Sequence, residues 1–207
     1  MEDNHTKNTW NQLANAYSQK FMDLDMYNDT YDAFCELVKK NAVILELGCG
    51  PGNITRYILK NRPDFNVLAT DFAPAMVDLA KQNNPAAQCQ VLDCREINAL
   101  NRKFDAIIIG FCMPYLSIDE CIKLVHDCAG NLTTGGALYF SFIHGDPSQS
   151  GARTSSDGKY TMSMYYHEMG YMQKALADSG MNIQHIFNKD YKQPDRLDVH
   201  TIIIATR

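Results

Sequence analysis

The stretch VILELGCGPGN, residues 43–53, decides the fold. An apolar run leads into Glu46, and three glycines follow at Gly48, Gly50 and Gly52. Glycine has no side chain, so a glycine-rich turn lets a ligand come close to the backbone. The stretch therefore predicts a buried strand that ends in a ligand-binding turn, and it leaves the identity of the ligand open.

The composition indicates one ordinary globular domain. The chain has 207 residues, 45% of them hydrophobic, and a formal net charge of −5. It has no stripe of lysine and arginine interleaved with aromatic residues, so a nucleic acid is not expected as the main partner. No apolar run is long enough to cross a bilayer, and the polar first residues lack the apolar core of a signal peptide. We expect residues 1–207 to form a single domain, as a monomer or a homodimer.

The cysteine pattern indicates free thiols. The chain has seven cysteines, none of which form a CxxC pair, and several fall inside expected strands or helices. This spacing favours buried thiols in a reducing cytoplasm and argues against disulfides and against a metal site. A cytoplasmic protein without a metal ion is the expectation.

Strand and helix patterns alternate along the chain. The expected strands are 42–47, 66–70, 88–93, 104–110, 136–143, 182–191 and 199–207, and the expected helices are two within 8–40, then 53–60, one from 74, 119–130 and 168–179. Such alternation predicts an α/β domain with a mostly parallel sheet. Residues 192–198 are too few for a helical crossover, so the last two strands should pair antiparallel.

Two segments outside the expected sheet are interpreted as covers of the site. Residues 1–41 carry aromatic residues at helical spacing and are expected to form a helical lid on a core of residues 42–207. Residues 144–161 are polar and rich in glycine and serine, which predicts a long loop within a lid segment of residues 144–167.

Two common glycine-rich loops do not fit the opening stretch. A phosphate-binding loop needs a lysine after its glycines, and none follows here. A dinucleotide-binding loop needs a third glycine at the position that Asn53 occupies. A nicotinamide-dependent oxidoreductase therefore remains only a weaker alternative.

The motif ELGCGPGN resembles the first motif of the class I S-adenosylmethionine-dependent methyltransferases. The resemblance extends over about residues 42–143 and includes Asp71 after the second expected strand and Asp93 after the third. Thr134 stands where the family usually has proline, which is a minor departure. The resemblance implies a Rossmann-like seven-stranded, mostly parallel sheet with an antiparallel last strand, N-terminal lid helices, and S-adenosylmethionine as the cofactor.

The resemblance also implies a set of cofactor-binding residues: Tyr17, Glu46, Gly48, Cys49, Gly50, Asp71, Phe72, Met76, Asp93, Cys94 and Phe111. In the family, the acid that matches Asp71 accepts hydrogen bonds from the ribose hydroxyls, and the acid that matches Asp93 accepts from the adenine amino group. Plainer roles stay open, because Asp71 could be a helix N-cap, Asp93 a surface acid and Glu46 a strand-end acid.

The acceptor side is expected around residues 8–40, 111–116 and 144–167, which are rich in aromatic residues and methionine. The candidates for substrate contact are Phe21, Tyr27, Met113, Tyr115 and Tyr166. His144 and His167 are the candidate catalytic residues, because they lie at the end of a strand and near the start of a helix that border the expected cleft. His185 and His200 lie within the last strands and are interpreted as remote from the cleft.

These observations predict in-line methyl transfer to a small or medium-sized, partly apolar organic acceptor. A cofactor-binding regulatory protein without catalytic activity is the alternative from another functional class. The sequence does not identify the acceptor or the atom that is methylated.

Overall fold

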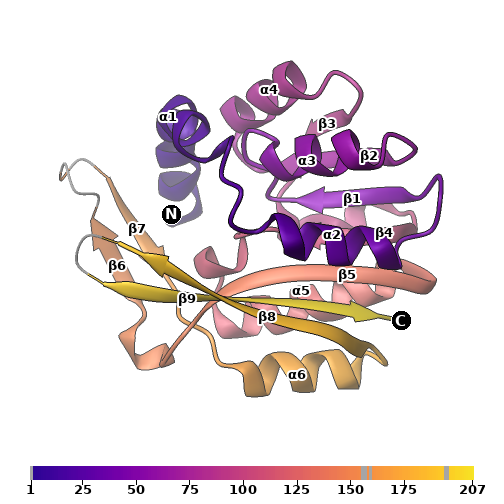
Figure 1. Ribbon diagram of the computed structural model, residues 1–207. Helices are drawn as coiled ribbons and strands as arrows, with labels where there is room; N and C mark the ends of the chain where they lie inside the picture. Colours follow the sequence, from indigo (N-terminus) through magenta and orange to yellow (C-terminus); the bar gives the residue numbers. More distant parts are fainter. Residues whose placement is uncertain (1, 155–157, 159, 194–195) are drawn as a thin grey trace.

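The computed structural model describes residues 2–154, 158, 160–193 and 196–207. Its main sheet has seven strands in the order β3-β2-β1-β4-β5-β9-β8 (Figure 1). The strands are β1 (Val43–Leu47), β2 (Asn66–Asp71), β3 (Gln88–Val91), β4 (Phe104–Ile109), β5 (Leu132–His144), β8 (Asn182–Lys192) and β9 (Leu197–Thr206). The strands β3, β2, β1, β4 and β5 pair in parallel, whereas β9 pairs antiparallel with both β5 and β8. The predicted mostly parallel sheet with an antiparallel last strand is confirmed.

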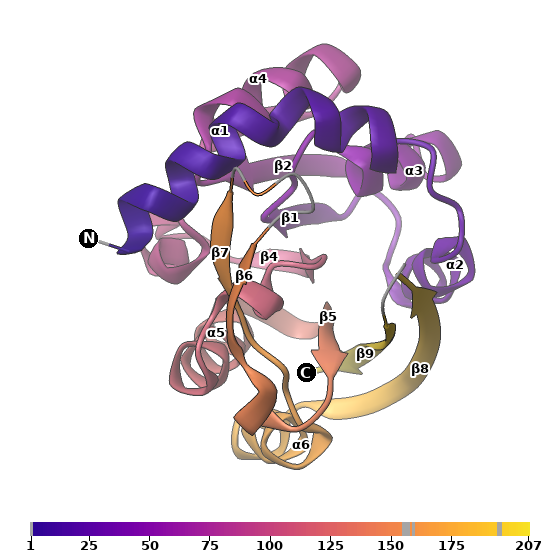
Figure 2. The same cartoon turned by 90° about the vertical axis from the view of Figure 1, so that its left-hand side faces the viewer.

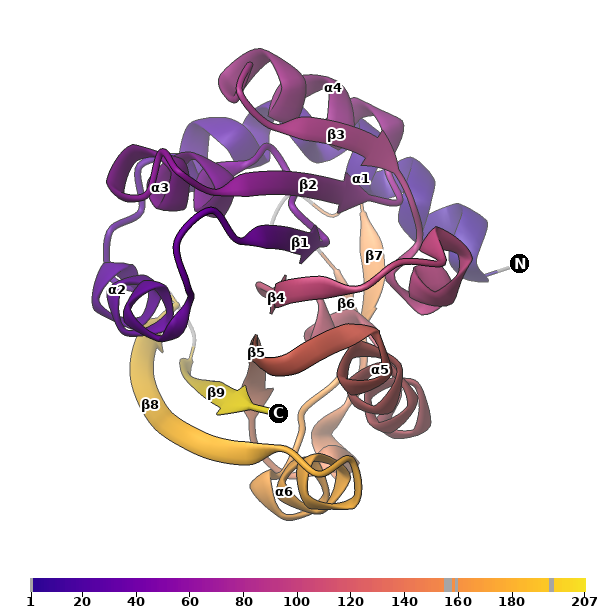
Figure 3. The same cartoon turned by 90° about the vertical axis from the view of Figure 1, so that its right-hand side faces the viewer.

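Helices cover both faces of this sheet (Figure 3). They are α1 (Glu2–Phe21), α2 (Asn28–Leu37), α3 (Asn53–Asn61), α4 (Pro74–Asn83), α5 (Ile118–Asn131) and α6 (Met169–Asp178), with short 3-10 helices η1 (Cys94–Leu100), η2 (Met113–Tyr115) and η3 (Pro147–Gln149). One buried cluster packs β4 and β5 against η1, α5 and α6, and a second packs the opposite face against α2 and α3. Among the described residues, no helix combines the length and apolar character that a bilayer span requires.

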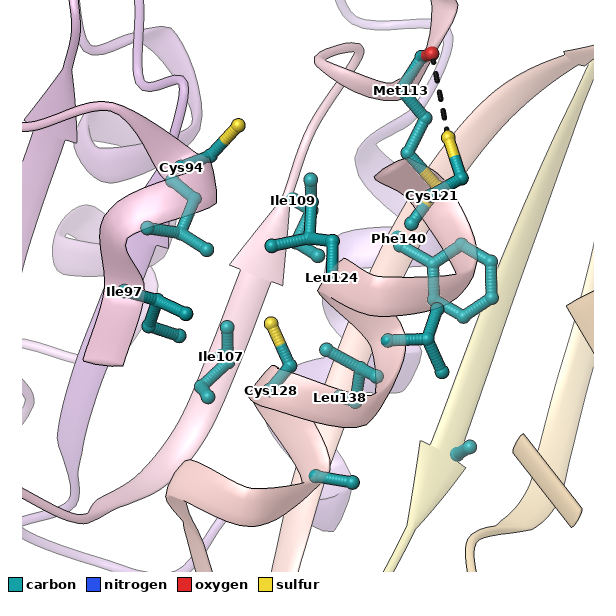
Figure 4. Packing of buried hydrophobic residues seen from close by; sticks show 14 of the residues in the cluster. Cys94, Ile97, Ile107, Ile109, Met113, Cys121, Leu124, Cys128, Leu138 and Phe140 are labelled. Atoms are coloured by element: carbon teal, nitrogen blue, oxygen red, sulfur yellow. Dashed lines mark hydrogen bonds between the residues drawn. The ribbon is translucent and has the colours of Figure 1, made fainter. Parts of the chain in front are cut away.

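The central strands are apolar on both sides because each side faces a helical layer. Ile107 and Ile109 of β4 point into the first cluster, and Ile108 between them points into the second. Figure 4 shows the first cluster, where the β4 side chains meet Leu124 and Cys128 of α5. This packing holds the carboxyl ends of the parallel strands at one edge of the sheet.

The two helices that precede the sheet have different positions. The helix α1 packs against α4 and crosses the edge at which the parallel strands end (Figure 2). The helix α2 belongs to the layer beneath the sheet, with Tyr31, Phe34 and Cys35 buried in the second cluster. Of the helical segment expected to act as a lid, only α1 lies over the strand ends.

The segment after β5 differs from the predicted loop. Gly151–Thr154 form β6 and Thr161–Met164 form β7, which pair as an antiparallel two-stranded ribbon. The threonine hydroxyls of Thr154 and Thr161 lie 3.0 Å apart across it. The prediction of an irregular loop over residues 144–161 was wrong for β6 and for Thr161, the first residue of β7. The sequence GART of β6 is not rich in the residues typical of strands, so composition gave no signal for it. The predicted loop residues 155–157 and 159 lie outside the described residues.

Candidate functional site

An open cavity of about 820 Å³ lies at the carboxyl ends of β1, β2, β3 and β4. The turns after these strands form its floor and sides, and Thr6, Trp10 and Tyr17 of α1 form its cover. Ligands in open α/β sheets bind at this position, outside the carboxyl ends of the strands where the order of connections reverses. Here the order reverses between β1 and β4.

The glycine-rich turn after β1 forms one wall of this cavity. Gly48 and Gly50 have φ values of 67° and 54°, in the left-handed region that other residues rarely adopt. A Cβ atom on Gly48 would lie 3.0 Å from the Cβ atom of Cys112, which is closer than almost any real contact. The turn therefore needs glycine both for its conformation and for its close approach to the turn after β4.

Asp71 ties the turn after β2 to the glycine-rich turn. Its Oδ2 accepts a hydrogen bond from the Gly50 N–H at 2.9 Å, and its Oδ1 accepts one from the Ala73 N–H at 2.9 Å. Burial raises the pKa of this carboxyl to about 6. Each carboxylate oxygen has a further lone pair, so Asp71 can organise two backbone segments and still accept hydrogen bonds from a ligand.

Asp93 and Arg95 form a charged pair on the opposite side of the cavity. Asp93 caps η1 by accepting the Arg95 N–H, and its Oδ2 lies 2.6 Å from the Arg95 guanidinium. Burial alone would raise the pKa of Asp93, but the hydrogen bonds from Arg95 outweigh it and hold the pKa below its ordinary value. Asp93 therefore presents an ionised carboxylate on the cavity wall at neutral pH.

Two thiols line the same cavity near its centre. The Sγ atoms of Cys94 and Cys112 lie 3.4 Å apart. The hydrogen bond with Cys112 and burial both raise the pKa of Cys94. All seven cysteines are free thiols, and a protonated Cys94 is a poor nucleophile. Among the described residues, no three histidine, cysteine or acidic side chains are grouped so that they could hold a metal ion.

A second cavity of about 820 Å³ adjoins the first. Both cavities are lined by Tyr17, Phe111 and Tyr115, so these three aromatic residues form the boundary between them. Phe111 follows β4 and has a φ of 57°, which places its ring at this boundary. Beyond it, the second cavity is lined mainly by aromatic and aliphatic side chains from α1, the end of β5, β7 and the β8–β9 pair.

Comparisons with known proteins show similarity to methyltransferases. A family model described as "Methyltransferase domain" matches residues 44–136, which include the glycine-rich turn. A malonyl-[acyl-carrier protein] O-methyltransferase of Ilyobacter polytropus is 29% identical over 79% of this chain and 58% of its own length. A tRNA N(3)-methylcytidine methyltransferase of Schizosaccharomyces pombe is 29% identical over 66% of this chain and 49% of its own length. A solved S-adenosylmethionine-dependent methyltransferase of Clostridium acetobutylicum has the same fold, with a TM-score of 0.71 and 18% identity over 96% of this chain and 98% of that structure.

Residues 44–136 match this methyltransferase family, and the fold of the chain is that of the class I S-adenosylmethionine-dependent methyltransferases. The predicted cofactor is thereby confirmed at the level of the family. The chain spans about half the length of the curated relatives it matches.

Nine of the residues predicted to bind the cofactor line the first cavity: Tyr17, Gly48, Gly50, Asp71, Phe72, Met76, Asp93, Cys94 and Phe111. Glu46 and Cys49 do not line it, and they are only 1% and 2% exposed. The Glu46 carboxylate accepts a hydrogen bond from the Thr55 hydroxyl in the first turn of α3. Burial raises the pKa of Glu46 to about 8. Glu46 therefore lies one layer behind the cavity wall.

The two histidines predicted to be catalytic lie outside both cavities. His144 is exposed at the end of β5. His167 is fully buried, with Nδ1 2.5 Å from the Tyr171 hydroxyl and Nε2 3.0 Å from the Met113 carbonyl oxygen. Burial lowers the pKa of His167. Its two hydrogen bonds hold η2 against α6, so neither histidine is positioned to contact an acceptor in the second cavity.

The histidine on the wall of the second cavity is His200, which sequence analysis placed far from the cleft. That interpretation was wrong. Because β9 is antiparallel, its amino-terminal half lies at the edge where the parallel strands end, and His200 pairs in register with Ile143 near the end of β5. The antiparallel pairing was itself predicted, so the sequence contained the signal that relocates this histidine.

The five residues predicted to contact substrate divide into two groups. Phe21, Tyr27 and Tyr115 line the second cavity. Met113 does not, because its side chain is buried in the first cluster above α5 (Figure 4). Tyr166 is also buried away from the cavity, and its hydroxyl donates to Asp198 at 3.4 Å.

Several cavity residues had no sequence signal in the family motifs. Trp10 of α1 reaches the first cavity, where its ring packs edge-on against Tyr17 and Tyr115 at centroid distances of 5.3 Å. Tyr191 and Gln193, at the end of β8, line the second cavity with His200. The edge position of the β8–β9 pair is the signal that could have found them.

Proposed function

We propose that this chain transfers a methyl group from S-adenosylmethionine to a small or medium-sized, partly apolar organic acceptor held in the second cavity. The observation that carries the proposal is the boundary of Tyr17, Phe111 and Tyr115 between two adjoining cavities. A ligand in each cavity would meet its neighbour at this boundary, as a group transfer requires. When bound, the cofactor supplies an electrophilic methyl group on a positively charged sulfur.

The residues of the first cavity would orient the cofactor. Asp71 would accept hydrogen bonds from vicinal ribose hydroxyls, since its carboxylate is already fixed by two backbone N–H groups. Asp93 would accept from the adenine amino group, with the Phe72 ring against the base. The glycine-rich turn would lie flat against the methionyl and ribose portion.

The residues at the boundary would align the two reactants and exclude water. Holding an acceptor in line with the reacting group is the main contribution that a protein makes to such a displacement. The aromatic walls would also desolvate the acceptor atom. No covalent intermediate on the protein is needed.

The lining of the second cavity favours a small acceptor over a nucleic acid. One relative is named as a tRNA methyltransferase and another as a malonyl-[acyl-carrier protein] O-methyltransferase. Here Lys20 is the one basic side chain apart from histidine among the lining residues that the structure describes, and the other walls are mainly aromatic and aliphatic. Recognition of RNA normally uses many basic side chains along an extended surface.

The test uses S-adenosylmethionine with a deuterated methyl group. The purified chain is incubated with three separate fractions of a cell extract, namely small molecules, tRNA and proteins, and the label is located by mass spectrometry. Label in the small-molecule fraction is expected. Label confined to tRNA or to protein would contradict the acceptor class. Tight cofactor binding without label in any fraction would instead favour the non-catalytic regulatory alternative.

A further inference from the structure

The wall of the second cavity contains a hydrogen-bonded pair of Tyr27 and His200. The Tyr27 hydroxyl lies 2.6 Å from Nδ1 of His200. The imidazole stacks on the Tyr191 ring with a centroid distance of 4.9 Å and an interplanar angle of 17°. Its other neighbour is Phe111, at 5.2 Å, which forms the boundary with the first cavity. His200 is therefore clamped in one orientation beside the place where the reactants would meet.

The second ring nitrogen of His200 opens into the cavity. No described side chain or backbone group bonds Nε2, and no buried side-chain nitrogen or oxygen is left without a partner in the described part of the chain. Nε2 therefore keeps accessible surface, and the cavity is the space that His200 lines.

The proton of the imidazole belongs on Nε2. Burial lowers the pKa of His200 to about 4, so the ring is neutral at physiological pH. Burial also raises the pKa of Tyr27 far above its ordinary value, so its hydroxyl keeps its proton. Among the described residues, Nδ1 of His200 is the one acceptor bonded to the Tyr27 hydroxyl. We therefore assign the hydroxyl as the donor, which leaves the ring proton on Nε2. The ring thus presents a hydrogen-bond donor to the cavity.

The charged residues around the second cavity favour an anionic ligand, as the Nε2–H donor does. Lys20 lines the cavity, whereas none of the lining residues in the described part of the chain is an aspartate or glutamate. The nearest acid along β9 is Asp198, which is 3% exposed and accepts hydrogen bonds from Arg196 and Gln193. A cationic acceptor would find no carboxylate among the described lining residues, but an anionic one would find a donor and a positive charge.

We propose that the second cavity selects a flat aromatic acceptor whose methyl-accepting oxygen is already an anion, with the Nε2–H of His200 donating to that oxygen and Lys20 supplying positive charge. This inference rests on the proposed methyl transfer and names its substrate class. The aromatic walls of Phe21, Tyr191 and Phe111 suit a planar ring. The structure thereby replaces His144 with His200 as the histidine that contacts substrate.

The reaction balances without a general base. A lone pair of the anionic oxygen forms the new bond to the methyl carbon while the bond from that carbon to sulfur breaks, and the bonding electrons stay on sulfur. The negative charge of the oxygen and the positive charge of the sulfonium disappear together, and no proton is transferred. A neutral imidazole of low pKa, which is a weak base, suits this role of donor better than the role of proton acceptor.

The test measures binding of three probes that share a propylphenyl body and differ in the charge and chemistry of the head group. They are 4-propylbenzoate, 4-propylphenol and 4-propylbenzylamine, which are anionic, neutral and cationic at pH 7.5. Calorimetry is carried out with the chain saturated by S-adenosylhomocysteine, so that binding is measured without turnover. We expect the benzoate to bind at least ten-fold more tightly than either other probe.

Two variants and one matched control complete the test. His200→Gln and Tyr27→Phe should each reduce the preference for the benzoate at least five-fold, because one removes the donor and the other frees its tautomer. His185→Gln replaces an exposed histidine on β8 that lines neither cavity, and it should leave the preference unchanged. Both site variants should bind S-adenosylhomocysteine within two-fold of the wild type, which also shows that they are folded.

Different failures identify different errors. If S-adenosylhomocysteine does not bind the wild type, the proposed function itself fails. If it binds but the phenol or the amine binds as tightly as the benzoate, or if both site variants keep the full preference, the anionic acceptor is overturned and the proposed methyl transfer stands.

Discussion

The first cavity takes its polar groups from the turns that directly follow β1, β2, β3 and β4, whereas the second takes its walls from segments that are far apart in the chain. In the first, Asp71 and Asp93 lie at or near strand ends and accept hydrogen bonds from backbone N–H groups, whereas α1 supplies only the cover. In the second, side chains from α1 meet side chains from β8 and β9, and ring packing fixes them. The first kind of cavity suits a ligand that related proteins share. The second kind suits a ligand that differs from one related protein to another. Cofactor affinity should therefore respond strongly to changes in the turns and weakly to changes behind them.

The largest expected effect on cofactor affinity comes from Gly50→Val. The side chain would project from a left-handed turn on the cavity wall, 3.7 Å from the Tyr17 ring, and would fill space that the cofactor needs. A clash of about 3 kcal/mol lowers affinity roughly 100-fold. Calorimetry with S-adenosylhomocysteine measures this loss.

Gly135→Val is the matched control for Gly50→Val. Gly135 also has a positive φ, 75°, but no atom lies within 4 Å of where its Cβ would be. The control should lose about 1–2 kcal/mol of folding stability from backbone strain and keep its cofactor affinity. Equal loss of affinity in both variants would mean that strain alone, and not occupation of the cavity, explains the effect.

An intermediate effect is expected from Asp71→Asn. The substitution removes the charge that strengthens hydrogen bonds from the ribose hydroxyls, and such bonds contribute about 1.5–3 kcal/mol, so affinity should fall roughly ten-fold or more. The exposed Asp78→Asn in α4 should have no effect. Unchanged affinity in Asp71→Asn would show that Asp71 serves only as a helix cap.

The pH dependence of cofactor affinity in the wild type tests the same role of Asp71. The ionised form of Asp71 is the better acceptor, and the pKa of the unliganded carboxyl is about 6. Cofactor affinity should therefore be constant above about pH 7 and decrease as pH falls through 6, whereas Asp71→Asn should show no such decrease.

The smallest effect on cofactor affinity is expected from Glu46→Gln. Glu46 does not line the cavity, and with a pKa of about 8 it is mostly protonated at pH 7, so glutamine resembles it in shape and charge. Affinity at pH 7 should stay within two-fold. A loss of ten-fold or more would show that this acid contacts the cofactor after all.

Folding stability should reveal what Glu46 does instead. Because its folded pKa is raised above the ordinary value of 4.5, its contribution is fully present below pH 4.5 and is lost as pH rises to 8. The stability of Glu46→Gln relative to wild type should therefore increase over this range, by on the order of a few kcal/mol. Urea unfolding at pH 5, 7 and 9 measures the difference, and Asp71 titrates alike in both proteins.

The first cavity could be predicted from the sequence better than the second. The sheet, its antiparallel last strand and most of the lining of the first cavity could be predicted, because strand periodicity and the turns after β1, β2 and β3 are short-range features. Glu46 was predicted to bind the cofactor but lies behind the wall of the first cavity. Its burial depends on how α3 packs, which the local sequence does not show. His200 was also misplaced, because its distance from the cleft was judged from its place in the sequence and not from the direction of β9.

The antiparallel direction of β9 also bears on how this methyltransferase could change its substrate. Tyr191, Gln193 and His200 all lie on the β8–β9 pair, which contributes no residue to the first cavity. Exchanging residues 191–200 for the equivalent segment of a relative should therefore transfer the acceptor preference of that relative. Cofactor affinity should stay unchanged. Because the two cavities are built by different segments of the chain, mutations can change acceptor binding without changing cofactor binding.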